Sequence, residues 1–289
     1  MAIFNLGSIN IDLVYQVPHL PKPGETLSAL AFSQGLGGKG ANQSVAAARA
    51  GASCIHIGAT GPGSEWLLGL MSDYGVETGS VTQLDEPTGH AVINVDPEAE
   101  NSIVIYPGAN RQITGAMVEV ALARAVAGDS LLLQNETSAQ QEAAALARAR
   151  GMRVVYSAAP FDLAAVRSVL GHVSLLVMNE GEAAELRAAE GQLPAVDCII
   201  TRGANGAEWI SAETEPLFMP SFRVEPVDTT GAGDTFIGTL VAALDLGLDR
   251  SSAMRRAAAA SALQVTRPGA AQAIPTAAEV TAFLAAQGA

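Results

Sequence analysis

The sequence predicts an α/β protein in which helices flank a mainly parallel sheet and a small second sheet lies beside it. Between residues 115 and 201, helical and strand-like segments alternate along the chain, a rhythm typical of parallel sheets. Four strand-like segments before residue 107 do not fit that alternation. The 289 residues are 49% hydrophobic, which allows a large core.

The first part of the chain begins with strands. The apolar run Ala2–Leu6, which ends at Gly7, predicts a buried strand. Leu13–Val17 and Thr26–Phe32 are expected to be strands, because a turn rich in proline and glycine, PHLPKPGE, separates them. The pattern then predicts an alanine-rich helix over 41–50, a strand over 53–58, and a helix over 63–74 that ends at Gly75.

A hairpin and the alternating segments follow. His90–Asp96 and Ser102–Tyr106 flank the short turn PEAEN, which predicts a hairpin and not a strand–helix unit. Helices are expected over 115–127, 139–150, 163–169 and 182–189, with strands over 130–134, 153–156, 175–178 and 197–201. Three more helices are expected over 234–246, 250–265 and 277–286.

These segments predict two parts. Residues 1–9, 34–88 and 107–289 are expected to form the α/β core, and residues 10–33 and 89–106 the small sheet. A small sheet beside a ligand cleft can serve as a lid. Because open strands expose edges that favour pairing with another chain, we expect a homodimer through the strands of this lid.

Composition and charge narrow the function classes. A net charge of −13 and a pI near 4.7 argue against a nucleic-acid surface, although a helix N-terminus can still bind a small anion. We find no apolar run of about 18 residues and no basic leader, so we expect a cytoplasmic protein with no membrane contact. Cys54 and Cys198 lie in apolar runs and are expected to be buried thiols, and no histidine pair has the spacing of a zinc site.

The segment GLGGKGANQ, residues 35–43, contains four glycines, which would let a ligand approach its backbone. Gly35, Gly37 and Gly40 match G-x-G-x-x-G, but the acidic residue of a dinucleotide-binding loop does not follow. A Walker A loop is excluded because Gly40 follows Lys39 where that loop has Ser or Thr. The free N–H groups at the start of the next helix, with Lys39 and Asn42, offer a polyol several donors. The alternative is a tight turn onto a helix, with Lys39 solvated.

The segment VDTTGAGDTF, residues 227–236, places three small residues before a helix. Gly231, Ala232 and Gly233 leave N–H groups free at a helix N-terminus, where the macrodipole favours an anion. Asp234 at the same end can accept a proton from an alcohol while these N–H groups hold charge on a transferring phosphoryl group. The alternative is a capped turn in which Asp234 only starts the helix.

Taken together, GGKGANQSVAAARAG (37–51) and DTTGAGDTFIGTL (228–240) resemble the two signature motifs of the ribokinase, or PfkB-type, family of sugar kinases. Similar segments occur in the family's order along the chain: GSINIDLV (7–14), ENSIVIYPGAN (100–110), MNEGEAAEL (178–186), TRGANG (201–206) and VTRPGA (265–270). The resemblance implies a ribokinase-like three-layer α/β/α sandwich with a small β-sheet lid. It also implies transfer of the ATP γ-phosphoryl group to the hydroxymethyl group of a sugar, and SINID with GGKGANQ favours ribose.

The resemblance assigns the sugar side of the site. Asp234 would be the base that accepts the hydroxyl proton, and Gly231, Ala232 and Gly233 would form the anion hole. The sugar would lie between the small sheet and the main sheet. Its contacts would be Asn10, Asp12, Gly38, Lys39, Asn42, Glu136 and Asp234.

The resemblance also assigns ATP, Mg²⁺ and a monovalent cation. The nucleotide would contact Asn179, Thr201, Gly203 and Gly206. Glu182 would act on Mg²⁺ through bound water, since Mg²⁺ keeps several waters and takes few protein ligands. A monovalent cation, usually potassium, would be held beside the anion hole by Asp228, Thr230, Val265 and Gly269, although Ala273 stands near a family serine that helps to hold it.

Two kinds of alternative stay open. Kinases of fructose, 2-keto-3-deoxygluconate and nucleosides share both motifs. A non-catalytic sugar-binding regulator could use the same scaffold. Asp234 argues against the regulator, because a protein that only binds sugar does not need a base.

Overall fold

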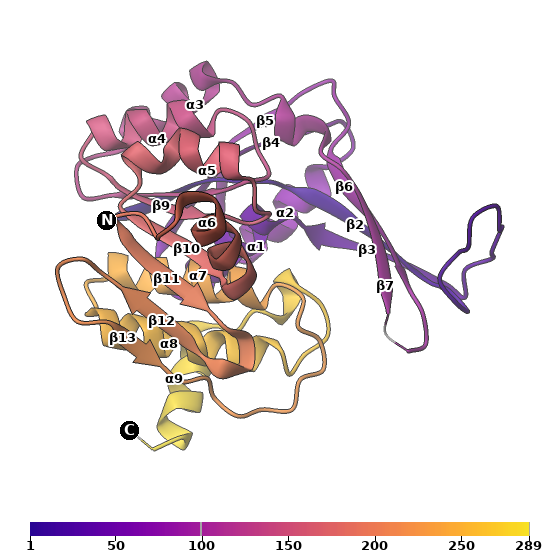
Figure 1. Cartoon of the computed structure of the whole chain (residues 1–289). Coiled ribbons are helices and arrows are strands. Elements are labelled where there is room, and N and C mark those ends of the chain that lie inside the picture. The colour runs from indigo at the N-terminus through magenta and orange to yellow at the C-terminus, as the bar shows by residue number, and fades with distance from the viewer. Residues whose placement is uncertain (99, 289) are drawn as a thin grey trace.

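The computed structural model describes residues 1–98 and 100–288. Its body is a three-layer α/β/α sandwich, from one side of which a smaller sheet projects (Figure 1). The predicted α/β class with a mainly parallel sheet is therefore confirmed. Within the described ranges, no helix combines the length and the apolar character that crossing a membrane requires.

The large sheet contains nine strands among the described residues, in the order β13-β12-β11-β10-β9-β8-β1-β4-β5. Neighbours from β11 to β5 run parallel, whereas β12 and β13 are antiparallel additions at one edge. The strands span Ala2–Leu6 (β1), Ser53–Thr60 (β4), Glu77–Gln83 (β5), Ser130–Gln134 (β8), Arg153–Ser157 (β9), Leu175–Asn179 (β10), Asp197–Thr201 (β11), Ala207–Ile210 (β12) and Leu217–Met219 (β13).

Helices cover both faces of the large sheet (Figure 1). One face packs against α3 (Gly115–Ala121), α4 (Gln140–Ala149), α5 (Leu163–Val169) and α6 (Glu180–Glu190). The other packs against α1 (Lys39–Arg49), α7 (Ala232–Asp245) and α8 (Arg250–Gln264), while α2 (Glu65–Asp73) packs beside α1 and α9 (Ala277–Ala286) against α8.

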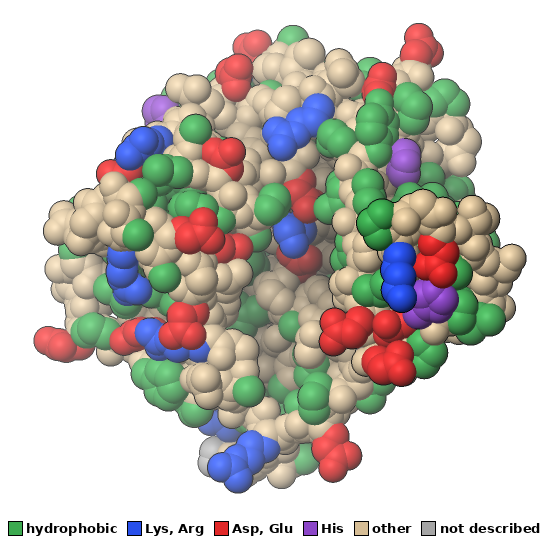
Figure 2. Space-filling view, turned by 45° about the vertical axis from the view of Figure 1, so that its right-hand side comes forward, with side chains coloured by type: hydrophobic (Ala, Val, Ile, Leu, Met, Phe, Trp, Pro, Cys, Tyr) green, Lys and Arg blue, Asp and Glu red, His purple; other side chains and the backbone are tan. Residues whose placement is uncertain are grey.

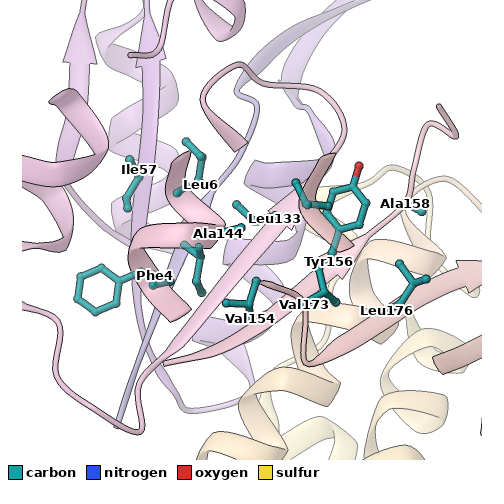
Figure 3. Close-up of a cluster of buried hydrophobic side chains, with 14 of the residues drawn as sticks. Phe4, Leu6, Ile57, Leu133, Ala144, Val154, Tyr156, Ala158, Val173 and Leu176 are labelled. Atoms are coloured by element: carbon teal, nitrogen blue, oxygen red, sulfur yellow. The ribbon is translucent and has the colours of Figure 1, made fainter. Parts of the chain in front are cut away.

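Alternation along the strands divides the core between the two faces. In β8, Leu131 and Leu133 pack on the side of α3–α6, and Leu132 packs on the side of α7 and α8. All three side chains are fully buried. Figure 3 shows part of the core on the side of α3–α6, where Phe4, Leu133 and Tyr156 come from neighbouring strands. Burial on both faces explains why the central strands have nearly continuous apolar sequences.

The small sheet has the order β3-β2-β6-β7, formed by Ala31–Gly37, Asn10–Gln16, Gly89–Val95 and Asn101–Tyr106. The predicted hairpin is confirmed as the antiparallel pair β6–β7; residue 99 of its expected turn lies outside the described residues. The strand predicted over 26–32 is wrong. Instead, β3 begins at Ala31 and runs into the glycine segment, because its pairing with β2 extends from Gln16↔Ala31 to Asn10↔Gly37.

Two close backbone approaches position the site. A Cβ on Gly40 would lie 2.3 Å from the Gly7 Cα, so the start of α1 rests directly on the chain that leaves β1. A Cβ on Gly238 would lie 2.4 Å from the Gln43 carbonyl oxygen, so α7 rests equally closely on α1. Only glycine permits either approach. The first turns of α1 and α7 therefore meet at the carboxyl ends of the central strands.

We expect Leu133→Ala to lower the free energy of unfolding by about 2–5 kcal/mol, the usual effect of truncating a fully buried leucine. Urea denaturation followed by circular dichroism measures the change. The exposed Val120 of α3, replaced by alanine, is the control and should change stability by less than about 0.5 kcal/mol. Equal stability of the two variants would contradict the assigned core.

Candidate active site

Asp234 lies in the first turn of α7 and is gripped by two side-chain amides of α1. Asn42 Nδ2 donates to Asp234 Oδ2 at 3.1 Å, and Gln43 Nε2 donates to Asp234 Oδ1 at 2.9 Å. The side chain of Asp234 is only 9% exposed. The structure thus brings the glycine segment and the second motif together at one carboxylate.

Burial sets the protonation of this carboxylate. Loss of water raises the pKa of Asp234 to about 6, although the Lys39 ammonium and the hydrogen bonds from Gln43 and Asn42 act to lower it. The carboxylate is therefore ionised near neutral pH, yet it binds a proton more readily than an exposed aspartate. Such a pKa suits a general base.

The backbone before and within the first turn of α7 presents amides to the same space. Gly231 adopts a positive φ of 78°, which favours glycine. The N–H of Ala232 donates to the Thr229 carbonyl at 3.2 Å, so it is already used. The N–H groups of Gly231 and Gly233 have no partner among the residues that the structure describes, and a Cβ on Gly233 would meet only open space. These amides can receive an anion at the helix N-terminus.

A chain of buried polar side chains supports Gln43 from behind. Gln134 Nε2 donates to Gln43 Oε1 and to Asn5 Oδ1, both at 2.7 Å. Asn5 Nδ2 donates to Ser44 Oγ at 2.8 Å. All four side chains are fully buried. The amides of Gln43 and Asn5 are each bonded through both the oxygen and the nitrogen, so Gln43 can present only its N–H group to the carboxylate.

The same chain ends on a histidine. His56 Nδ1 lies 2.8 Å from Ser44 Oγ, and His56 Nε2 lies 3.0 Å from the Gly7 carbonyl oxygen. The carbonyl can only accept, so Nε2 carries the proton and Nδ1 accepts from Ser44. Burial lowers the pKa of His56 to about 4, which keeps the ring neutral. Every hydrogen bond from Gly7 to Asp234 therefore has one possible direction.

Lys39 provides positive charge beside the base. Burial acts to lower the pKa of Lys39, but the carboxylates of Asp234, Glu136 and Glu182 raise it above its ordinary value. Glu136 follows β8, accepts the backbone N–H of Lys39 at 3.0 Å and accepts the Ser8 hydroxyl. The ammonium is therefore charged and lies within the electrostatic reach of acids from three parts of the chain.

The other residues predicted to bind sugar gather where the small sheet joins the body. Asn10 is buried, and its Oδ1 accepts from Asn110 Nδ2 at 2.8 Å. Asp12 lies over Gly37, where a Cβ would fall 2.0 Å from Asp12 Oδ1. Burial, and secondly Glu136, raise the pKa of Asp12 to about 6. Gly38 directly precedes α1 and has a positive φ of 94°, a conformation that favours glycine.

The residues predicted to bind the nucleotide follow strand ends at the same edge of the sheet. Asn179 and Thr201 end the adjacent parallel strands β10 and β11 and are register partners. Asn179 Oδ1 accepts the Glu182 N–H at 2.9 Å, and Glu182 Oε2 accepts the Asn179 N–H at 2.8 Å, a capping box that starts α6. Gly203 and Gly206 lie in the turn after β11, both with positive φ.

Eight of the predicted site residues line one cavity. Its lining includes Lys39, Asn179, Glu182, Thr201, Gly231, Ala232, Gly233 and Asp234. Figure 2 shows a hollow at the centre of that view, with a basic side chain between acidic ones at its floor. The carboxyl edge of a parallel sheet is where open α/β folds bind ligands. Asn10, Asp12, Gly38, Asn42, Glu136, Gly203 and Gly206 are not part of this lining.

The fit to the two expected metal ions differs. Glu182 borders the cavity, burial raises its pKa, and its Oε1 accepts no hydrogen bond from the described residues, so one carboxylate oxygen is available to Mg²⁺-bound water. Mg²⁺ held mostly by water and phosphate suits such a site. The groups expected to hold a monovalent cation do not fit that ion, because N–H donors of the chain already bind them. The Asp228 carboxylate accepts two backbone N–H groups, and the carbonyls of Thr230, Val265 and Gly269 accept from backbone or side-chain N–H groups.

Sequence reasoning missed Ser8, Gln43, Asn110 and the buried polar chain. Part of the signal was present, because Asn5 and His56 lie inside otherwise apolar strands and Gln134 ends another. A polar side chain inside a buried strand requires a partner.

Comparisons with known proteins place this fold and its motifs in a family. Residues 2–277 match the model of the pfkB family of carbohydrate kinases. A ribokinase of Haemophilus influenzae is 37% identical over 96% of this chain and 97% of its own, and one of Bacillus subtilis is 37% identical over 96% and 98%. The structure of Arabidopsis thaliana ribokinase complexed with ribose and ATP has a TM-score of 0.86 at 27% identity and covers 98% of this chain and 99% of its own.

The chain belongs to the pfkB family of carbohydrate kinases. The Haemophilus influenzae and Bacillus subtilis relatives, each 37% identical to it, are both ribokinases.

If Asp234 is the general base, turnover should fall as pH falls through about 6, because only the ionised carboxylate accepts a proton and its pKa is raised to about 6. The pKa of Asp12 is also raised to about 6, so a variant that affects only one of the two acids is needed. Gln43→Leu is such a variant, because Gln43 donates to Asp234. Loss of the N–H donor destabilises only the Asp234 carboxylate and should move the acid limb upward by about one pH unit or more, since such a bond contributes about 1.5–3 kcal/mol.

Initial rates measured against pH for both proteins test this expectation. The exposed Gln112, replaced by leucine, is the control and should keep the parental profile. An unmoved acid limb in Gln43→Leu would assign the titration to a group other than Asp234.

Proposed function

We propose that the protein is an ATP-dependent ribokinase that transfers the γ-phosphoryl group of ATP to the 5-hydroxyl of ribose. One observation carries the proposal: a buried carboxylate, held by two amides, lies beside N–H groups at a helix N-terminus that have no partner in the described part of the chain. The ribokinases among the relatives support ribose as the sugar. The ribose and ATP in the Arabidopsis thaliana structure support this pair of substrates.

The reaction needs a base and a place for developing charge. In the proposed mechanism, Asp234 takes the proton of the sugar hydroxyl while the oxygen of that hydroxyl forms a bond to the γ-phosphorus. The bond from the γ-phosphorus to the bridging oxygen breaks, and its electron pair leaves on ADP. The amides of Gly231 and Gly233 hold the negative charge of the transferring group, with Ala232 keeping the turn closed through Thr229.

We assign sugar binding to the groups around the junction with the small sheet. Asp12 and Glu136 are acceptors for sugar hydroxyls, and Asn10 is oriented for the same task by Asn110. The backbone at Gly38 and the Lys39 ammonium supply donors. Asn42 serves mainly by holding Asp234, although its buried Oδ1 has no partner among the described residues and can accept a sugar hydroxyl.

We assign the nucleotide to the neighbouring strand ends. Asn179 and Thr201 border the cavity, and Gly203 and Gly206 form the turn beyond β11 that would pass along the base or ribose of ATP. Glu182 would orient water on Mg²⁺, which neutralises phosphate charge when bound. The proposed mechanism contains no monovalent cation.

We place this activity in the cytoplasm. ATP as phosphoryl donor supports that compartment. Cys54 and Cys198 are both buried and free, which is usual for proteins in a reducing environment.

Asp234→Asn should lower turnover with ribose by about 10²–10⁴-fold, the usual loss when a positioned base is removed, while ATP binding persists. A coupled ADP-release assay over ribose, fructose, 2-keto-3-deoxygluconate and nucleosides measures turnover, and calorimetry measures ATP binding. Asp73→Asn at the exposed end of α2 is the control. Near-normal turnover of Asp234→Asn would refute the base, and tight ribose binding without turnover in the parent protein would favour a regulator.

We further propose a homodimer through the small sheet. This sheet projects from the body (Figure 1), and its strand β7 exposes apolar side chains on both faces, with Val104 65% and Ile105 56% exposed. Phe32 on the opposite edge strand is 55% exposed. Apolar strands with open edges are stabilised by pairing with a second copy.

Sedimentation velocity at micromolar concentration should show a dimer, and the double variant Ile103→Lys, Ile105→Lys should be monomeric because two charges would be buried in the interface. Val120→Lys places the same charge on an exposed position of α3 and should leave the dimer intact. A monomeric parent protein would remove the proposal.

A further inference from the structure

Gln264, the last residue of α8, lies between two loops at the N-terminal end of α7. Its side chain is fully buried. Its Nε2 donates to the Thr230 carbonyl at 2.5 Å and to the Gly269 carbonyl at 3.1 Å. One amide group thus joins the loop that leads into the anion hole to the loop that follows α8.

The carbonyls that Gln264 binds are two of the groups expected to hold a monovalent cation. The other expected groups are also occupied. Asp228 Oδ1 accepts the Thr230 N–H at 2.9 Å, and Asp228 Oδ2 accepts the Gly269 N–H at 2.8 Å. The Val265 carbonyl accepts the N–H groups of Val227 and Asp228 at 2.7 and 3.1 Å.

A potassium ion is held by oxygens that converge on one point and replace its hydration shell. A primary amide offers two N–H donors, the number needed to satisfy two converging carbonyls. Turning the amide over would place Gln264 Oε1 against both carbonyl oxygens, which are acceptors. The N–H assignment therefore holds even though Gln264 Oε1 has no partner among the described residues.

We propose that the Gln264 side-chain amide takes the place of a monovalent cation beside the anion hole, so that this protein needs no potassium. Its two hydrogen bonds hold Thr230, and through it Gly231, in the position that an ion would otherwise impose. Ala273 fits this assignment, because it has no hydroxyl with which to complete an ion site. The inference rests on the proposed kinase function only for its activity readout.

The test compares potassium chloride with tetramethylammonium chloride at equal ionic strength, using ribose turnover and the thermal unfolding midpoint. For the parent protein both quantities should be the same in the two salts. Gln264→Glu keeps the shape of the side chain but replaces the donor with an anionic acceptor. Together with the two carbonyls this carboxylate makes a cation site, so potassium should raise both turnover and the unfolding midpoint of the variant.

Gln112→Glu, an exposed substitution, is the matched control and should respond to neither salt. Potassium activation of the parent protein by tenfold or more, with a higher unfolding midpoint, would overturn the proposal, because Gln264 would then yield its place to the ion. If Gln264→Glu does not fold, the comparison on the parent protein decides alone. Absence of turnover in both salts would count against the kinase function, and the unfolding midpoints would still test the role of Gln264.

Discussion

The two hydrogen bonds from Asn42 and Gln43 to the Asp234 carboxylate are the contact on which the site depends. They join residues 192 and 191 positions apart in the sequence, and they link α1 to α7 at the point where the two helices begin. Gly40 and Gly238 make the link possible, since a side chain at either would force the helices from their places. A buried carboxylate without such donors would bind a proton at neutral pH and lose its use as a base.

The fold could be predicted wherever burial leaves a clear pattern. The central strands β1, β8, β9, β10 and β11 are apolar on both faces, and their predicted bounds agree within one residue. The strands that were missed lie near or at edges: β5 has the polar sequence ETGSVTQ, and β12 and β13 are short antiparallel additions. In β3 the sequence SQGLG resembles a loop, and only its pairing with β2 makes it a strand.

The candidate site shows the same division. The glycine segment and the second motif were predictable because their residues have special backbone properties, visible at Gly231 and Gly38. The polar residues inside the strands showed that partners were needed, but the partners could not be predicted, because the contacts among Asn5, Gln43, Ser44, His56 and Gln134 depend on how three strands and a helix are placed. Gln264 is a similar case, since a single glutamine at a helix end shows nothing in sequence of the two carbonyls it meets.

The amides around Asp234 also determine how the enzyme can recover after each turnover. Side-chain amides of asparagine and glutamine do not relay protons, and both carboxylate oxygens face such a group. The neutral His56 lies farther along the same chain, with Gln43, Gln134, Asn5 and Ser44 between it and the carboxylate. In the proposed mechanism, a proton taken up by Asp234 therefore cannot be relayed through these amides, and it leaves through the mouth of the cleft as the products depart.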